Sequence, residues 1–98
     1  MSSLGSILDR EGVYAGYLGE GDTYPYDLSA LHIVNLSVVN DGTIDFTATV
    51  TYRNTDLGTE DIKVPVGYSM GLTTNEVTEI DVATGDSFTI ALFKRGTV

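Results

Sequence analysis

The chain lacks cysteine, a long apolar run and a recognisable export signal. Without cysteine it can form neither a disulfide nor a thiolate metal site. A domain of 98 residues without such cross-links commonly gains stability from association with other chains. No apolar stretch approaches the ~20 residues that a membrane-spanning helix requires. The first ten residues have neither the basic N-terminal region nor the apolar segment of a signal peptide. We therefore expect no signal peptide, and we expect synthesis in the cytoplasm.

Basic residues are also scarce. Five Lys and Arg stand against fourteen Asp and Glu, which gives a formal net charge of −9 at pH 7. Phosphate recognition requires clustered Lys and Arg, so the composition disfavours nucleic acid and anionic membranes as partners. The acidic residues are dispersed, which is typical of a solubilising surface, and adaptation to salty surroundings is the alternative.

Catalytic patterns are equally sparse. His32 is the only histidine, and we expect it to be a partly buried or edge residue of a strand that is satisfied by its neighbours. No serine has the glycine pattern of a nucleophile elbow. Carboxylates lie close in sequence at Asp9 and Glu11, Glu20 and Asp22, Glu60 and Asp61, and Glu79 and Asp81. A domain this small has little room for the cleft that paired carboxylates need, so we expect no enzyme and no cofactor.

Two acidic segments next to glycines offer oxygen ligands for calcium. In residues 41–45, Asp and Gly are residues that favour turns, so no bound ion is needed to account for them. Residues 56–61 provide the better but weak candidates Asp56, Glu60 and Asp61, and neither segment has the spacing of an EF-hand. We therefore predict no metal.

Alternation of apolar and polar residues predicts several strands. It is clearest over residues 43–53, where Ile44, Phe46, Ala48, Val50 and Tyr52 share one parity, and Thr and charged residues share the other. A second run over residues 31–39 precedes it, with Val34, Leu36 and Val38 as the expected inner face. The intervening Asn-Asp-Gly at 40–42 is a turn signal, so we expect these two strands to form an antiparallel hairpin.

Three further strands follow. Residues 62–66 alternate, and Pro65 predicts an edge strand because proline cannot donate to a ladder. Residues 67–75 read as irregular. Alternation over 77–82 and 87–92, with a turn around Gly85, predicts a second hairpin. The chain is thus expected to be all-β, a small antiparallel β-sandwich of immunoglobulin-like type or a barrel.

The first thirty residues differ from the rest, because they hold five of the eleven glycines and four of the six tyrosines. We place a boundary near Asp27, between an N-terminal arm (1–27) and a β-sandwich core (28–98). Ser6 to Arg10 is expected to form a helical turn, and residues 13–18 a short strand. Tyrosine is enriched at interfaces, so the predicted docking residues are Tyr14, Tyr17, Tyr24 and Tyr26, with Pro65 marking the least paired edge.

Two segments resemble a known family. Residues 38–50, VVNDGTIDFTATV, and residues 82–90, VATGDSFTI, resemble the strand–turn–strand passages of CARDB-like immunoglobulin-fold domains. The likeness covers roughly residues 31–93. It implies a seven-stranded sandwich used in adhesion and surface assembly. The chain is also similar in size, charge and β-content to small capsid-decorating and tail proteins of phages.

These observations predict a structural assembly protein. We expect a phage virion component, a capsid decoration or tail accessory protein, whose arm docks on a capsid or tail protein or on a second copy. A CARDB-like adhesion or binding module of a larger cell-surface protein is the alternative.

Overall fold

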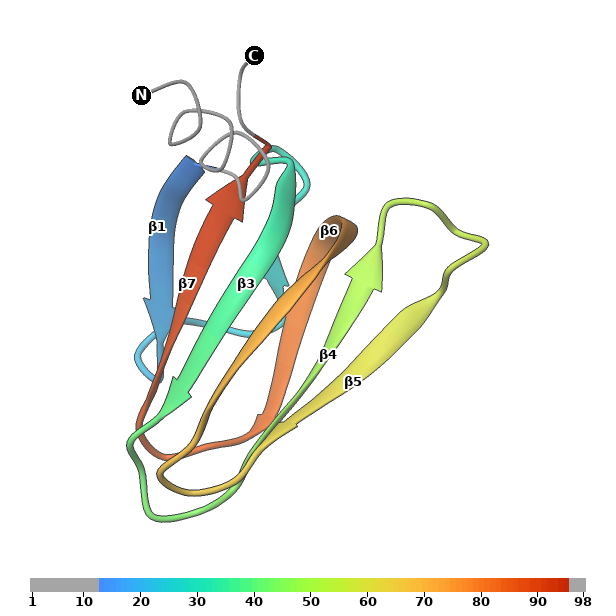
Figure 1. The fold of residues 1–98 in the computed structure, drawn as a ribbon. Helices are drawn as coiled ribbons and strands as arrows, with labels where there is room; N and C mark the ends of the chain where they lie inside the picture. Colours follow the sequence, from blue (N-terminus) through green and yellow to red (C-terminus); the bar gives the residue numbers. More distant parts are fainter. Residues whose placement is uncertain (1–12, 96–98) are drawn as a thin grey trace.

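The computed structural model describes residues 13–95, apart from the side chains at positions 73 and 74. Within this range the chain is all-β and contains no helix. Seven strands follow one another along the chain (Figure 1): β1 (Val13–Gly19), β2 (Tyr26–Asp27), β3 (Ile33–Asn40), β4 (Phe46–Tyr52), β5 (Thr59–Val64), β6 (Ser69–Thr84) and β7 (Phe88–Lys94). The expected helical turn at Ser6 to Arg10 lies outside the described residues.

One long strand folds the antiparallel ladder over on itself. The strands are ordered β1-β7-β3-β6-β4-β5, and the short β2 pairs with β6. The first half of β6 pairs with β3, from Ser69 to Val77, and its second half pairs with β4, from Val77 to Thr84. In Figure 1, β6 rises beside β3 and then descends beside β4. The ladder therefore forms two layers of a small β-sandwich and does not close into a barrel.

The core lies between these two layers and is built by alternation. Four residues of β4 share the inner parity and are buried: Phe46, Ala48, Val50 and Tyr52. The Phe46 and Phe88 rings meet edge to face, with 4.9 Å between centroids, and so join the second layer to the first. Ile44 is 47 % exposed, because β4 begins two residues after it. The predicted inner face of the longest alternating run is thus confirmed from Phe46 onward.

Both predicted hairpins are wrong, although their strands exist. β3 pairs with β6 and β7, whereas β4 pairs with β5 and β6, so the Asn-Asp-Gly segment joins strands of opposite layers. The segment around Gly85 likewise joins two strands that do not pair with each other, β6 and β7, because β7 pairs with β1 and β3. A turn signal shows that the chain reverses, but it does not choose the partner strand. We call these two connections arches; they are residues 41–45 and 85–87.

Asn40 holds the first arch in place. It is the one buried polar residue among those described, with 1 % of its surface exposed. Its side-chain amide donates to the carbonyls of Ile44 and Val64, each at 2.9 Å, and its side-chain oxygen accepts from the Gly42 N–H at 3.0 Å. The buried amide thereby satisfies backbone groups that the ladder leaves unpaired at this end of the sandwich.

Within the predicted arm, the structure describes residues 13–27, and these lie on the sandwich. β1 pairs with β7 along its length, and Leu18 is 3 % exposed and belongs to the core. Residues 67–75 are not irregular, because β6 already begins at Ser69. The edge position of the strand before Pro65 is confirmed, since β5 ends the ladder.

Candidate functional site

A bulge in β1 places two tyrosines on one face of the sheet. Tyr14 pairs with Phe93 and Tyr17 pairs with Ala91, and the register shifts between Tyr14 and Gly16. Phe93 and Ala91 are two residues apart and point to the same side, so their partners do too. In a regular strand, residues three apart would face opposite ways. The extra residue therefore turns both tyrosines outward while Leu18 stays in the core.

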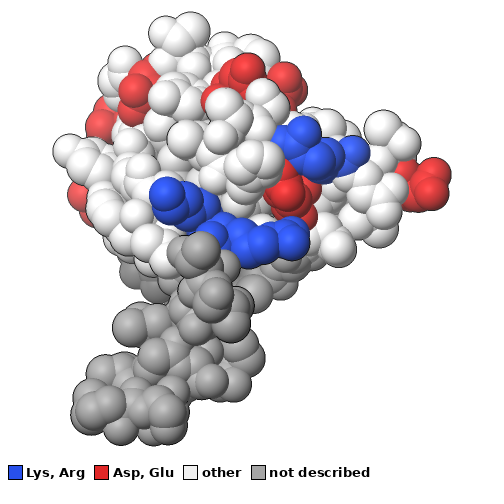
Figure 2. Space-filling model, turned by 90° about the horizontal axis from the view of Figure 1, so that it is seen from above, with Lys and Arg blue, Asp and Glu red and all other residues white. Residues whose placement is uncertain are grey.

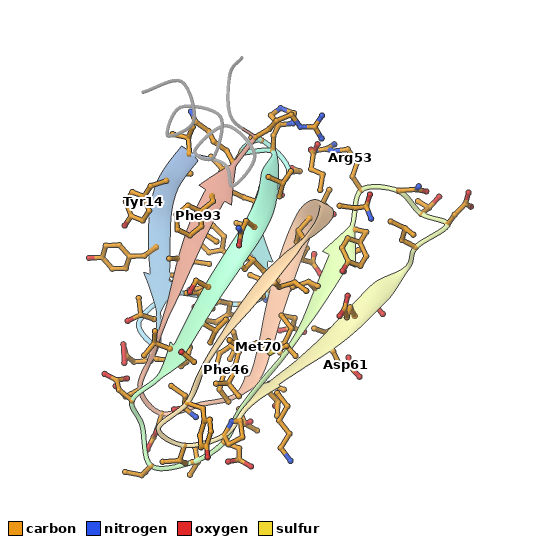
Figure 3. The ribbon with its side chains drawn as sticks, in the orientation of Figure 1. Tyr14, Phe46, Arg53, Asp61, Met70 and Phe93 are labelled. Carbon is orange, nitrogen blue, oxygen red and sulfur yellow. The ribbon has the colours of Figure 1, made fainter. Side chains whose placement is uncertain are left out.

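Around these tyrosines lies a surface without charge, which we call the tyrosine face. It comprises the outward positions of β1, β7 and β3: Tyr14, Tyr17, Thr89, Ala91, Phe93, Asn35, Ser37 and Val39. Tyr14 is 56 % exposed and Tyr17 is 68 % exposed, which is unusually open for large aromatic side chains. The Tyr14 ring meets the edge of Phe93, with 5.9 Å between centroids, on the outer side of β1 and β7 (Figure 3).

The opposite outer face of the sandwich has the reverse character, and we call it the acidic face. It comprises outward residues of β2, β4, β5 and the second half of β6: Asp27, Thr47, Thr49, Thr51, Asp61, Lys63, Glu79 and Asp81. The Thr49 hydroxyl donates to Asp61 at 3.0 Å. Figure 3 shows Asp61 on β5, across the molecule from Tyr14. Over residues 13–95 the two outer faces therefore differ in charge, and the outward residues of the tyrosine face carry none.

The two ends of the ladder differ in the same way. β5 has three charged residues in six, Glu60, Asp61 and Lys63, and Pro65 follows it. Charges and prolines at an edge discourage pairing with another chain. β1, with the sequence VYAGYLG, has no charge at all and pairs only with β7 among the residues described. The edge next to the tyrosine face is therefore the one less protected by charge.

Tyr24 and Tyr26 were predicted as docking residues beside Tyr14 and Tyr17, but both pack against the core. The Tyr24 hydroxyl donates to the Gly19 carbonyl at 2.7 Å, and its ring lies 6.2 Å from that of Phe88. Burial, and then the nearby carboxylates of Asp22 and Glu20, raise the pKa of Tyr24 to about 12. Tyr24 and Tyr26 are thus partly buried and anchor the β1–β2 segment to the core.

His32 lies in a cluster of charges at one end of the sandwich. It precedes β3 in a left-handed conformation with φ 55°, and its exposed ring lies 2.9 Å from Glu76. Arg53 Nε donates to the same carboxylate at 2.5 Å, and Arg95 lies 3.9 Å away. Although burial acts to raise the pKa of Glu76, the bonds from Arg53 and His32 lower it overall. Basic side chains gather around an acidic one in the view onto this end (Figure 2).

The weak metal candidates do not converge. Glu60 and Asp61 are neighbours on a strand and face opposite ways: Glu60 accepts from the Tyr52 hydroxyl at 2.5 Å, and Asp61 accepts from Thr49. Asp56 lies in the preceding turn, where its N–H donates to Asn54. Over residues 13–95, no three acidic or histidine side chains are grouped as metal ligands.

The tyrosine face was not predicted from the sequence as a surface, although Tyr14 and Tyr17 were predicted as docking residues. The available signal was the spacing of Tyr14 and Tyr17 around Gly16, directly before an apolar Leu18. Glycine inside a strand often marks a bulge, and Gly16 has φ 134°.

None of the described residues forms a helix long and apolar enough to cross a membrane. No family model matches this chain, and comparisons with curated proteins and with solved structures gave no match.

Proposed function

We propose that the chain is a non-enzymatic structural or assembly protein that binds other proteins through the tyrosine face. The observation that carries this proposal is the bulge in β1, which turns Tyr14 and Tyr17 outward onto a surface free of charge. Bulges re-aim side chains and are over-represented near functional sites. A regular β1 would leave only one of these two rings outside.

The chemistry of this surface suits a protein partner. Tyrosine offers a large contact area at low cost in side-chain entropy and is enriched among residues that dominate interfaces. Interface centres are depleted in charged residues, as the tyrosine face is. The acidic face, by contrast, favours water and keeps the free protein soluble.

We further propose that the assembly is a phage virion, with the chain as a capsid decoration or tail accessory protein. Small size, acidity and an all-β fold support this placement, which rests on general character. The alternative is an adhesion or binding module of a cell-surface protein, favoured by the resemblance of residues 38–50 and 82–90 to CARDB-like domains.

A fractionation experiment separates these two proposals. The tagged protein is followed in the cells that make it, in a virion-sized particle fraction and in the cell envelope fraction. We expect wild type and Tyr68→Asp in the particles and Tyr17→Asp in the free fraction. Tyr68 is a matched control, because it is 67 % exposed and directly precedes β6, which lies three strands away from β1 in the ladder. Recovery in the envelope would favour the adhesion module, and equal retention of all three proteins in particles would refute docking through this face.

A further inference from the structure

We propose that a second copy of the chain binds at the edge of β1, next to the tyrosine face, with the two β1 strands paired antiparallel about a twofold axis. This inference rests on the proposed function and names its partner. It follows from the edge of β1 and from the charges at the two ends of that strand.

The uncharged edge is compatible with a copy of itself. β5 has two acidic residues, Glu60 and Asp61, against one basic residue, Lys63, so two β5 edges would bring net negative charge together, which is destabilising. Two β1 strands bring together only apolar, glycine and tyrosine residues. Beyond the bulge, β1 runs regularly from Gly16 to Gly19, opposite Leu92 to Thr89 of β7, so its free side has ordinary strand geometry there.

Charge then selects the antiparallel orientation. Glu20 follows the end of β1, directly after Gly19, and is exposed. Lys94 lies at the other end, where it is the β7 partner of Val13, and it is exposed too. Within residues 13–95, Lys94 forms no ion pair. Antiparallel pairing that sets Glu20 of each copy opposite Val13 of the other brings Glu20 within two strand spacings, about 10 Å between backbones, of Lys94, twice in one dimer. Parallel pairing would instead place like charges together.

The same geometry keeps the main negative charge apart. The acidic face lies on the opposite layer of the sandwich from the tyrosine face. A twofold axis at β1 therefore holds the two acidic faces away from the joined edges. Tyr14, Tyr17 and Phe93 of both copies then form one aromatic band across the paired strands. Such a contact is isologous and closes on itself as a dimer.

Charge reversal tests the orientation by analytical ultracentrifugation of the purified full chain. Glu20→Lys and Lys94→Glu should each raise the dimer dissociation constant by about tenfold, because each reversal breaks two pairs. The double variant should recover the wild-type value. Glu20→Lys reduces the net negative charge, so relief of general repulsion alone would strengthen dimerisation. Tighter binding of Glu20→Lys, or no recovery in the double variant, would overturn the proposed pairing.

A second pair of variants tests the surface itself. Tyr17→Asp should abolish the dimer, whereas Tyr68→Asp adds the same charge at equal exposure and should leave it intact. A wild-type chain that sediments as a monomer up to about 100 µM would overturn the second-copy proposal. If the chain is monomeric but Tyr17→Asp is lost from the particles, docking of the tyrosine face to another protein would still be supported. The reverse outcome is that the wild-type chain dimerises and Tyr17→Asp is recovered in particles as well as wild type. That result would refute the proposed function and leave the dimer standing.

Discussion

The Asp86 carboxylate accepts a hydrogen bond from the backbone N–H of Thr43 at 2.8 Å, across 43 positions of sequence. A second bond comes from the Thr43 hydroxyl, and the Ser87 hydroxyl donates in return to Asp41 at 2.9 Å. These bonds fasten the two arches to each other. The segments that the sequence marks as two separate hairpin turns thus form one structural unit at one end of the sandwich.

Gly42→Ala should destabilise the fold by about 1–3 kcal/mol, because the close approach of the arches leaves no room for a methyl group. A Cβ at position 42 would lie 2.8 Å from the Ser87 nitrogen and 2.9 Å from its carbonyl oxygen. Gly21→Ala is the control, since nothing lies within 4 Å of its added carbon. Urea unfolding of both variants makes the measurement, and equal midpoints would show that the arches do not pack as described.

Asp86 should make the protein sensitive to acid. The hydrogen bonds from the Thr43 side chain and backbone lower the pKa of Asp86 in the folded state. Its contribution to stability is therefore present above the unfolded-state pKa of about 4 and is lost as the pH falls through the folded value. Asp86→Asn should be less stable than wild type at pH 7, and the difference should shrink below about pH 4.

Asp81→Asn is the control for this pH dependence. Asp81 is exposed on the acidic face, where Thr49 is its β4 partner. Thermal unfolding of the three proteins across pH separates the local effect from the general relief of repulsion on acidification. A gap between wild type and Asp86→Asn that stays constant down to pH 2 would contradict the assignment.

Leu18→Ala should cost about 2–4 kcal/mol of unfolding free energy, because this β1 side chain is 3 % exposed and belongs to the core. Tyr17→Ala, at the neighbouring outward position, should change stability by less than about 0.5 kcal/mol. Removal of residues 1–26 should likewise unfold the domain. A truncated chain that keeps its cooperative transition would restore the idea of a dispensable arm.

Tyr24 should ionise late in an alkaline titration followed by tyrosinate absorbance. Burial and the carboxylates of Asp22 and Glu20 raise its pKa to about 12, above the ordinary value of 10.0. A raised folded-state pKa contributes stability that is complete below about pH 10 and is lost as the pH rises through about 12. Tyr24→Phe should remove this loss of stability at high pH. A wild-type titration in which no tyrosine ionises near pH 12 would contradict the raised pKa of Tyr24.

The strands were predictable from sequence because alternation is a local consequence of which residues meet the core. Residues 46–52 and 88–92 show it plainly, with Phe46 and Phe88 buried as their parity requires. Strand partners were not predictable in the same way. Asn40 and Gly42 determine that the chain turns, but Asn40 also bonds to the Val64 carbonyl, a contact that local patterns do not contain. That contact helps to hold β3 and β4 in different layers.

The docking surface was predictable only in part. Tyr14 and Tyr17 stood out by residue type, but so did Tyr24 and Tyr26, which pack inward. That Tyr14 and Tyr17 both face outward depends on one inserted residue in β1, which interrupts the alternation that a regular strand would show. The uncharged surroundings of Tyr17 become visible only when β1, β7 and β3 are placed side by side.

The central claim, that the tyrosine face meets a partner, can be tested within one molecule by oxidative footprinting of tyrosines. The reactivity of Tyr17 and Tyr68 is measured in dilute purified protein and in the cells that produce it, with Tyr68 as the internal reference because the two side chains are 68 % and 67 % exposed. We predict equal reactivity in the dilute protein and protection of Tyr17 alone in the cells. Equal reactivity of the two residues in both settings would contradict the claim.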